Sequence, residues 1–154
     1  MIFVCPEGEC KQVVQAHASA CAHARGAAAL VQRAGTNGSE VTWLAEDGVS
    51  VTYDGGVLVA TRGLGPDLMA ADVRGTVAAL GHGGGSAARV HEYLDGDEQI
   101  VRHEYDCRIA RVGAETIEIY ERTYATQKFE EECRRGNQTF TNTYWIDSAG
   151  VDRK

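Results

Sequence analysis

The fold class follows from the stretch Glu40-Val-Thr-Trp-Leu-Ala-Glu-Asp-Gly-Val-Ser-Val-Thr-Tyr-Asp-Gly-Gly-Val-Leu-Val-Ala-Thr61. Apolar and β-branched residues alternate here with others in three short runs, over residues 41–45, 49–53 and 57–61. Asp47-Gly48 and Asp54-Gly55-Gly56 separate the runs. Short turns rich in Asp and Gly between such runs are the strongest local signal for β-hairpins. The stretch therefore predicts a three-stranded antiparallel meander.

The C-terminal half repeats the two-residue period. Strands are expected over residues 89–94, 101–109, 116–124 and 139–147, with turns at Asp95-Gly96-Asp97 and at Gly113. Thr, Tyr and Val dominate these segments, as a pleated and half-buried surface favours. One face of the second strand carries Val101, His103, Tyr105, Cys107 and Ile109. Together with the meander, this pattern predicts an all-β fold, an antiparallel sandwich or an open barrel.

Two segments do not follow this period. Residues 1–35 hold nine alanines and little charge, and residues 13–31 are expected to form a weak helix or a disordered leader. Between the two β-rich halves, Leu68 to Leu80 is expected to form a short helix with Asp67 as its N-cap. We expect an atypical leader over residues 1–25 and one β domain over residues 26–154.

Length and charge narrow the class of protein. A chain of 154 residues is one domain, and 44% apolar residues with 24% charged ones exclude intrinsic disorder. Residues 1–86 carry 5 basic and 8 acidic side chains, and residues 87–154 carry 10 and 14. Neither part is basic, so a nucleic-acid partner is not expected. The first residues show no secretory signal as written, and no apolar run reaches the roughly 18–20 residues of a membrane span.

No catalytic, metal or cofactor motif is found. Gly81-His-Gly-Gly-Gly85 lacks the Lys-Ser/Thr of a phosphate-binding loop, and Cys107 and His103 lie about 13 Å apart along a strand. Cys5, Cys10 and Cys21, with His17 and His23 nearby, match no structural zinc spacing. Many acidic residues alternate along the later strands. Two of them facing each other would suit glycoside hydrolysis, but a solvated sheet face is the favoured interpretation.

Two further features leave alternatives open. Arg62 leaves a strand into Gly63-Leu64-Gly65, where it either binds an anionic or hydroxylated ligand or satisfies turn carbonyls, and the second is favoured. Cys107 and Cys133 both lie in strand-like surroundings. They form either a disulfide or two buried thiols, and their spacing does not favour one over the other.

Several strings resemble one known family: Thr42-Trp43, Asp47-Gly-Val-Ser50, Gly56-Val-Leu-Val-Ala-Thr-Arg-Gly-Leu-Gly65, Asp67-Leu-Met69, Tyr93-Leu-Asp-Gly96, Ile117-Glu-Ile-Tyr-Glu121, Phe129-Glu130 and Tyr144-Trp145, with Cys107 and Cys133. They are similar to the YjbF/GfcB family of group 4 capsule polysaccharide lipoproteins. The resemblance covers about residues 26–150. Family members normally begin with a lipoprotein signal and continue past the Tyr-Trp strand, so it also implies a foreign start and a shortened C-terminus.

The resemblance implies an all-β domain on the periplasmic side of the outer membrane, attached by a lipid that this chain as given does not carry. It implies a non-enzymatic accessory role in exopolysaccharide or capsule production or secretion, with envelope secretion proteins or the glycan itself as partners. An oxidising compartment favours a Cys107–Cys133 disulfide.

The resemblance assigns no binding residues, so we predict them from residue type. Sugar rings would stack on Trp43, Tyr120, Tyr124 and Trp145, with Arg62 placed for acidic groups. The alternative function is a hydrolase or lyase that acts on the same polysaccharide through paired carboxylates.

Overall fold

The computed structural model describes residues 31–64, 66–119 and 121–153. Two antiparallel sheets make up the described chain. The first has the strand order β1 (Val31–Asn37), β2 (Glu40–Ala45), β3 (Ser50–Asp54), β4 (Val57–Arg62). The second has the order β5 (Leu68–Asp72), β6 (Gly85–Leu94), β7 (Ile100–Ile119), β8 (Arg122–Arg135), β9 (Gln138–Asp147). The predicted all-β fold is confirmed, and of its two predicted forms the two sheets correspond to the antiparallel sandwich.

The first sheet contains the predicted meander as β2, β3 and β4, joined at the two Asp-Gly turns. The sequence did not predict β1, which pairs with β2 through the turn that follows Asn37. Of the helix expected over residues 13–31, only Val31 is described, and it begins β1.

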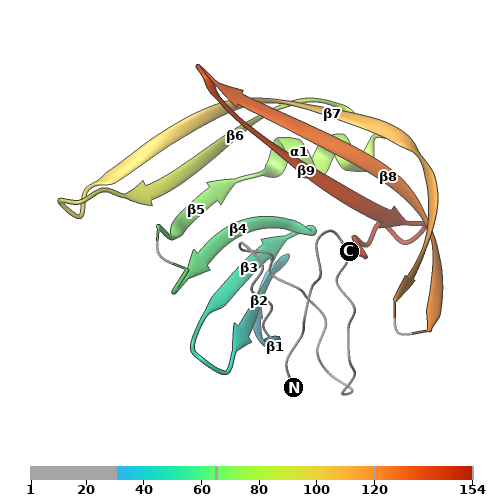
Figure 1. The fold of residues 1–154 in the computed structure, drawn as a ribbon, viewed down its shortest axis with the longest axis horizontal. Helices are drawn as coiled ribbons and strands as arrows, with labels where there is room; N and C mark the ends of the chain where they lie inside the picture. The colour runs from blue at the N-terminus through green and yellow to red at the C-terminus, as the bar shows by residue number, and fades with distance from the viewer. Residues whose placement is uncertain (1–30, 65, 120, 154) are drawn as a thin grey trace.

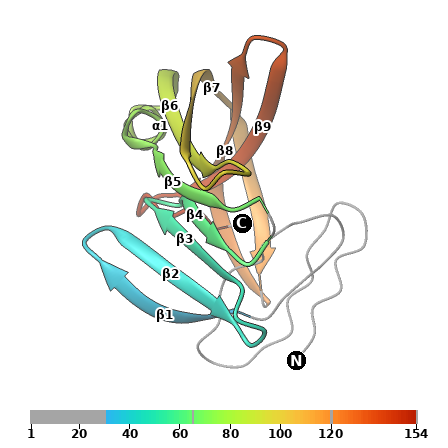
Figure 2. The same cartoon turned by 90° about the vertical axis from the view of Figure 1, so that its left-hand side faces the viewer.

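One helix, α1 (Arg74–Gly81), lies between β5 and β6 in the chain. Figure 1 shows β7 and β8 arching over α1 and β4, so the helix and the first sheet cover the same face of the larger sheet. The core lies in that layer. Its residues come from β4, from α1 and the residue before it, and from the inner face of β7, β8 and β9: Val57, Val59, Val73, Ala79, Leu80, Tyr105, Cys107, Ile109, Phe129, Cys133 and Tyr144. Figure 2 shows the smaller sheet packed below the larger one.

The helix expected from Leu68 was wrong in its first half. Residues 68–72 form β5, which pairs with β6 and starts the second sheet. Asp67 is not an N-cap, because its carboxylate accepts hydrogen bonds from the Thr61 hydroxyl and from the backbone N–H groups of Gly63 and Leu64. This turn links the two sheets.

The turn expected at Gly113 was also wrong. β7 continues through Gly113 as one strand of 20 residues, with a register shift between Arg111 and Gly113. A glycine inside a strand often marks such a bulge, which bends the strand without ending it. The expected strand over 116–124 is therefore split, because β7 ends at Ile119 and β8 begins at Arg122.

Candidate functional site

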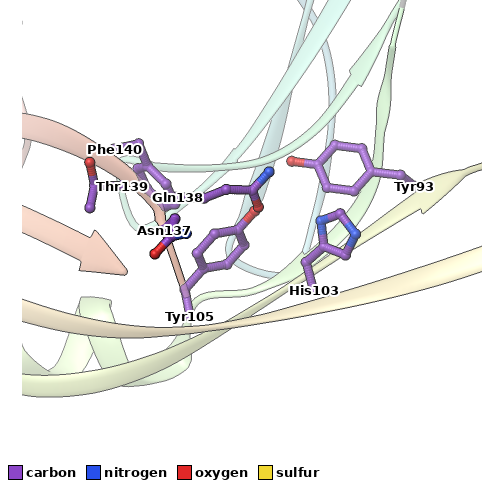
Figure 3. A pocket seen from close by; sticks show the side chains of 7 residues that line it. All are labelled: Tyr93, His103, Tyr105, Asn137, Gln138, Thr139 and Phe140. Carbon is purple, nitrogen blue, oxygen red and sulfur yellow. The ribbon is translucent and has the colours of Figure 1, made fainter. Parts of the chain in front are cut away.

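An open groove of about 570 Å³ lies on the inner face of the larger sheet. We call it the aromatic groove, and it is lined by Tyr93, His103, Tyr105, Asn137, Gln138, Thr139 and Phe140 (Figure 3). The pairing of β7 with β8 begins only at Asp106, whereas the pairing of β6 with β7 runs on to Leu94 and Ile100. The β6–β7 hairpin therefore extends past the β8–β9 hairpin, which leaves Tyr93 and His103 half-buried at the step.

The rings of the groove form a continuous row across three strands. The ring centroids of Tyr93 and His103 are 5.4 Å apart, those of His103 and Tyr105 are 6.4 Å apart, and those of Tyr105 and Phe140 are 5.1 Å apart. All three pairs are tilted or edge-to-face, which aromatic pairs prefer over direct face-to-face stacking. Ring faces are thereby held in fixed directions at the open end of the sheet.

His91 supports this row from within the protein. Its ring is 7% exposed and lies 5.0 Å from the Tyr105 ring and 5.5 Å from the Phe140 ring, measured between centroids. Its Nδ1 is 3.1 Å from the Tyr93 hydroxyl. Burial, and then the nearby Arg89 charge, lower the pKa of His91 to about 4. The imidazole is therefore neutral at physiological pH.

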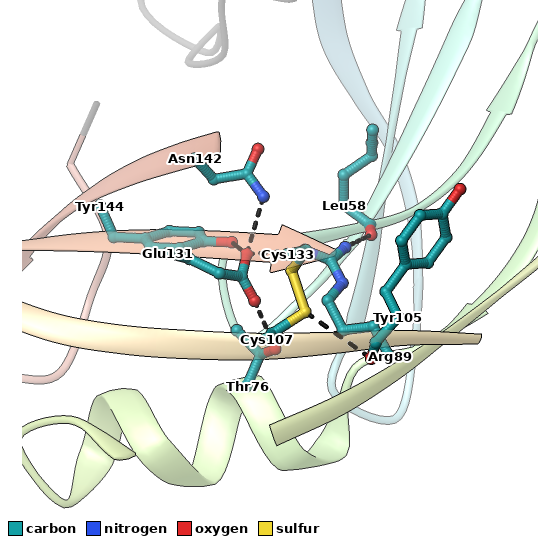
Figure 4. The surroundings of a disulfide bond; sticks show 9 residues. All are labelled: Leu58, Thr76, Arg89, Tyr105, Cys107, Glu131, Cys133, Asn142 and Tyr144. Carbon is teal, nitrogen blue, oxygen red and sulfur yellow. Dashed lines mark hydrogen bonds and ion pairs between the residues drawn. A yellow bond between two sulfur atoms is a disulfide. The ribbon is translucent and has the colours of Figure 1, made fainter. Parts of the chain in front are cut away.

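Next to the groove, a buried carboxylate joins four elements. Glu131 on β8 has no exposed surface and accepts hydrogen bonds from Thr76 on α1, Arg89 on β6, and Asn142 and Tyr144 on β9, at 2.7 to 2.8 Å (Figure 4). Burial alone would raise the pKa of the carboxyl. The Arg89 charge and the hydrogen bonds outweigh burial and hold this pKa below its ordinary value. Buried, ionised and fully hydrogen-bonded, Glu131 is a structural group.

The disulfide implied by the family resemblance is confirmed. Cys107 on β7 and Cys133 on β8 are directly opposite in the register, with Cα atoms 4.0 Å apart, and their sulfurs are bonded. The bridge lies in the core beside Glu131 (Figure 4). Because both sulfurs are used in the bond, neither offers a thiolate to a metal. The Cys/His set of residues 5–23 lies outside the described residues.

Of the two roles predicted for Arg62, the structure shows the favoured one, in which the side chain bonds turn carbonyls. Its guanidinium donates hydrogen bonds to the backbone carbonyls of Thr61, Leu68 and Met69, and so closes the turn between the two sheets. The distinctive Ala-Thr-Arg-Gly-Leu-Gly string therefore encodes a sheet-to-sheet connection. A binding role for Arg62 stays a prediction.

Of the four predicted stacking aromatics, the structure describes Trp43, Tyr124 and Trp145, and none of these three is among the described residues that line the groove. Trp43 is half-buried in the first sheet, and Tyr120 lies outside the described residues. In the second sheet, the Arg153 guanidinium lies 4.6 Å from the centre of the Tyr124 ring, and the Lys128 ammonium lies 5.5 Å from that of Trp145. A cation thus covers one face of each of these two rings. Their role in binding stays a prediction.

The signal for the groove was present but incomplete in the sequence. His91 and Tyr93 precede the Asp95-Gly96-Asp97 turn, and His103 and Tyr105 follow it at the same alternation. Pairing these runs as a hairpin would have placed the four rings together. The turn that follows β8 brings Phe140 and Gln138 to the same place, and nothing local in the sequence indicates that approach.

The acidic residues considered for hydrolysis are dispersed. The exposed Glu104, Asp106, Glu118, Glu130 and Glu132 alternate with the buried residues of β7 and β8, so they belong to the solvated outer face of the sheet, as the favoured interpretation held. The other three candidates differ: Glu121 is exposed just before β8, Glu115 is half-buried and lies 3.6 Å from Lys128, and Glu131 is fully buried. No acidic side chain is among the described residues that line the groove.

Among the described residues, no helix is long and apolar enough to cross a membrane. No curated protein matches this chain. Among solved structures, the hypothetical lipoprotein YmcC from Escherichia coli is similar, with a TM-score of 0.70 and 23% sequence identity over 83% of this chain and 69% of that one. That likeness shows a shared fold. The model of the group 4 capsule polysaccharide lipoprotein family, gfcB/YjbF, matches residues 9–152, and the chain therefore belongs to this family.

Proposed function

We propose that this protein is a non-catalytic accessory protein of exopolysaccharide or capsule production, held by a lipid on the periplasmic side of the outer membrane. Family membership supports the accessory role, and one observation on this protein supports binding: the aromatic groove offers aromatic rings, amides and hydroxyls. Sites of this kind bind by stacking and hydrogen bonding, and the described residues that line this one include no pair of carboxylates. The protein acts by binding glycan or a secretion partner.

The buried acid supports binding over chemistry. A catalytic carboxylate must reach the atom whose proton it moves. Glu131, the fully buried acid beside the groove, instead makes four internal hydrogen bonds and has no exposed surface. These bonds hold β6, β8, β9 and α1 together behind the groove.

Deletion of the gene in its native host tests the proposal. The deletion strain is expected to release or display much less polysaccharide, and a plasmid copy of the wild-type gene is expected to restore it. Cell fractionation with an antibody is expected to place the protein with the outer membrane. Unchanged polysaccharide in the deletion strain would contradict the accessory role. Shorter chains after incubation of purified polysaccharide with the protein would favour the hydrolase or lyase instead.

A further inference from the structure

We infer that the aromatic groove is a carbohydrate site that binds uncharged sugar units, with Tyr93 and His103 as the stacking surface and Gln138 and Asn137 as hydrogen-bonding partners. This inference rests on the proposed function, and it adds the ligand class and the residues.

The rings are placed for stacking before any ligand arrives. Tyr93 and His103 are only half-buried, while the more buried Tyr105 and the His91 ring hold them from the protein side. The bond between His91 Nδ1 and the Tyr93 hydroxyl fixes the Tyr93 ring further. Aromatic faces carry partial negative charge, and the C–H groups on the face of a sugar ring carry partial positive charge. A pre-ordered ring surface keeps the entropy cost of binding low.

The polar residues of the groove suit sugar hydroxyls. Asn137, Gln138 and Thr139 are exposed and come from the β8–β9 turn and the start of β9. Figure 3 shows the Gln138 side chain with those of Tyr93 and Tyr105, which line the same groove. Amides both donate and accept hydrogen bonds, as hydroxyl-rich ligands require. Rings on one side and amides on the other match a ligand with an apolar face and a polar rim.

Charge defines the class of sugar. The described lining residues include no Lys, Arg, Asp or Glu, and the nearby Arg89 is 3% exposed and paired with Glu131 at 2.8 Å. The whole chain carries a formal charge of -7. The exposed Arg135 guanidinium donates a hydrogen bond to Gln138 Oε1 at 3.1 Å, so the cation at this end of the groove already has a partner in the lining. An acidic sugar would have to compete with that bond and enter against the overall field of the protein. The groove volume of about 570 Å³ lies within the roughly 300–1,000 Å³ of ligand sites. It therefore suits a few neutral sugar units.

The test titrates the isotopically labelled protein with neutral hexasaccharides of glucose or galactose and with a hyaluronan hexasaccharide as the acidic probe. Amide NMR shifts and calorimetry report binding. Shifts are expected at the groove residues with at least one neutral probe, and weaker binding is expected for hyaluronan. His103→Ala and Tyr93→Ala are each expected to raise Kd roughly tenfold.

Arg102→Ala and Glu92→Ala are the matched controls. Each is the neighbour of a groove residue on the same strand, and each lies on the outer face, where the two side chains form an exposed ion pair at 3.6 Å. Both are expected to bind as the wild type does, and thermal melts of all four variants check that they fold.

Three results would overturn the inference: no groove shifts with any neutral probe, equal binding by the folded groove variants, or tighter binding of hyaluronan. If any of these three results is obtained and the deletion strain still loses its polysaccharide, the accessory function stands without this site. If the groove binds neutral sugar while the deletion strain is unaffected, the accessory function fails and the carbohydrate site remains.

Discussion

At the scale of single residues, Glu131 shows what a buried charge does in this fold. Its carboxylate joins α1, β6 and β9 to β8, and its loss leaves Arg89 charged at 3% exposure. We expect Glu131→Ala to lower the free energy of unfolding by about 3–5 kcal/mol, because removal of one partner leaves an uncompensated buried charge. Urea denaturation measures this. The neighbouring Glu132→Ala, on the exposed face, should cost less than about 1 kcal/mol. Similar losses in the two variants would contradict the structural role of Glu131.

His91 makes stability depend on pH. Its pKa of about 4 in the fold lies below the ordinary value of about 6.5 that applies when the chain unfolds. The folded state therefore binds the proton less readily, so this stabilisation is present above pH 6.5 and is lost as pH falls toward 4. We expect the free energy of unfolding to fall across this range, with a slope that approaches about 1.4 kcal/mol per pH unit. Urea titrations at pH 7.5, 6.5, 5.5 and 4.5 measure the slope.

The matching variant is His91→Phe, which keeps a ring between Tyr105 and Phe140 and removes the titrating group. Between pH 6.5 and 4.5 its stability should change much less. The lowered pKa of Glu131 acts in a more acidic window, because its stabilisation is lost only below the ordinary pKa of about 4.3. A slope in His91→Phe equal to that of the wild type would assign the pH dependence to other groups.

At the scale of elements, the sequence predicts what is local. The turns Asp47-Gly48 and Asp54-Gly55-Gly56 identified β2, β3 and β4, because their residues and their conformation agree. β1 was missed because only its first residue, Val31, is buried, so it shows no apolar alternation. The start of the helix was predicted too early, because residues 68–72 pair as a strand with β6, which lies some twenty residues later in the chain.

Packing between elements is tested at Gly56, in the turn between β3 and β4. A Cβ at this position would lie 2.8 Å from the Asp152 Cβ, in the segment after β9. Gly48 has almost the same φ (+88° against +85°) and has nothing within 4 Å of such a Cβ. In both alanine variants, the left-handed backbone should lower the free energy of unfolding by about 1–2 kcal/mol. Gly56→Ala should cost about 1–3 kcal/mol more, through overpacking. Equal losses in thermal or urea melts would show that the turn does not pack on residue 152.

At the scale of the whole molecule, the candidate site depends on topology. Tyr93, His103 and Phe140 form one surface for two reasons. The β6–β7 hairpin extends past the first residue of β7 that pairs with β8, and the β8–β9 turn lies against that extension. From residue type alone, the sequence predicts stacking on Trp43, Tyr120, Tyr124 and Trp145, and this stays a prediction. It did not single out Tyr93, His103 and Phe140, because nothing local indicates that β9 approaches the β6–β7 hairpin. By contrast, the disulfide was found through family resemblance, where spacing alone left both alternatives open.

The disulfide connects the fold to its compartment. It closes a loop of 26 residues, for which the chain-entropy model gives about 3.5 kcal/mol. Domains of this size are stable by roughly 5–15 kcal/mol, so the bond supplies a large share of the total. We expect Cys107→Ala, Cys133→Ala and the double variant to lose similar amounts of stability, about 2–5 kcal/mol, because either single change already breaks the bond.

The same bond should be formed in the cell. Alkylation of free thiols in protein from its native locus, followed by non-reducing peptide mapping, is expected to recover the Cys107–Cys133 peptide pair from the envelope fraction. Disulfides persist in oxidising compartments and are rare in the cytosol. Recovery of both cysteines as alkylated thiols from a cytosolic fraction would contradict the proposed periplasmic location. A double variant as stable as the wild type would show that the buried Glu131 network and the core hold the sheet without the bond.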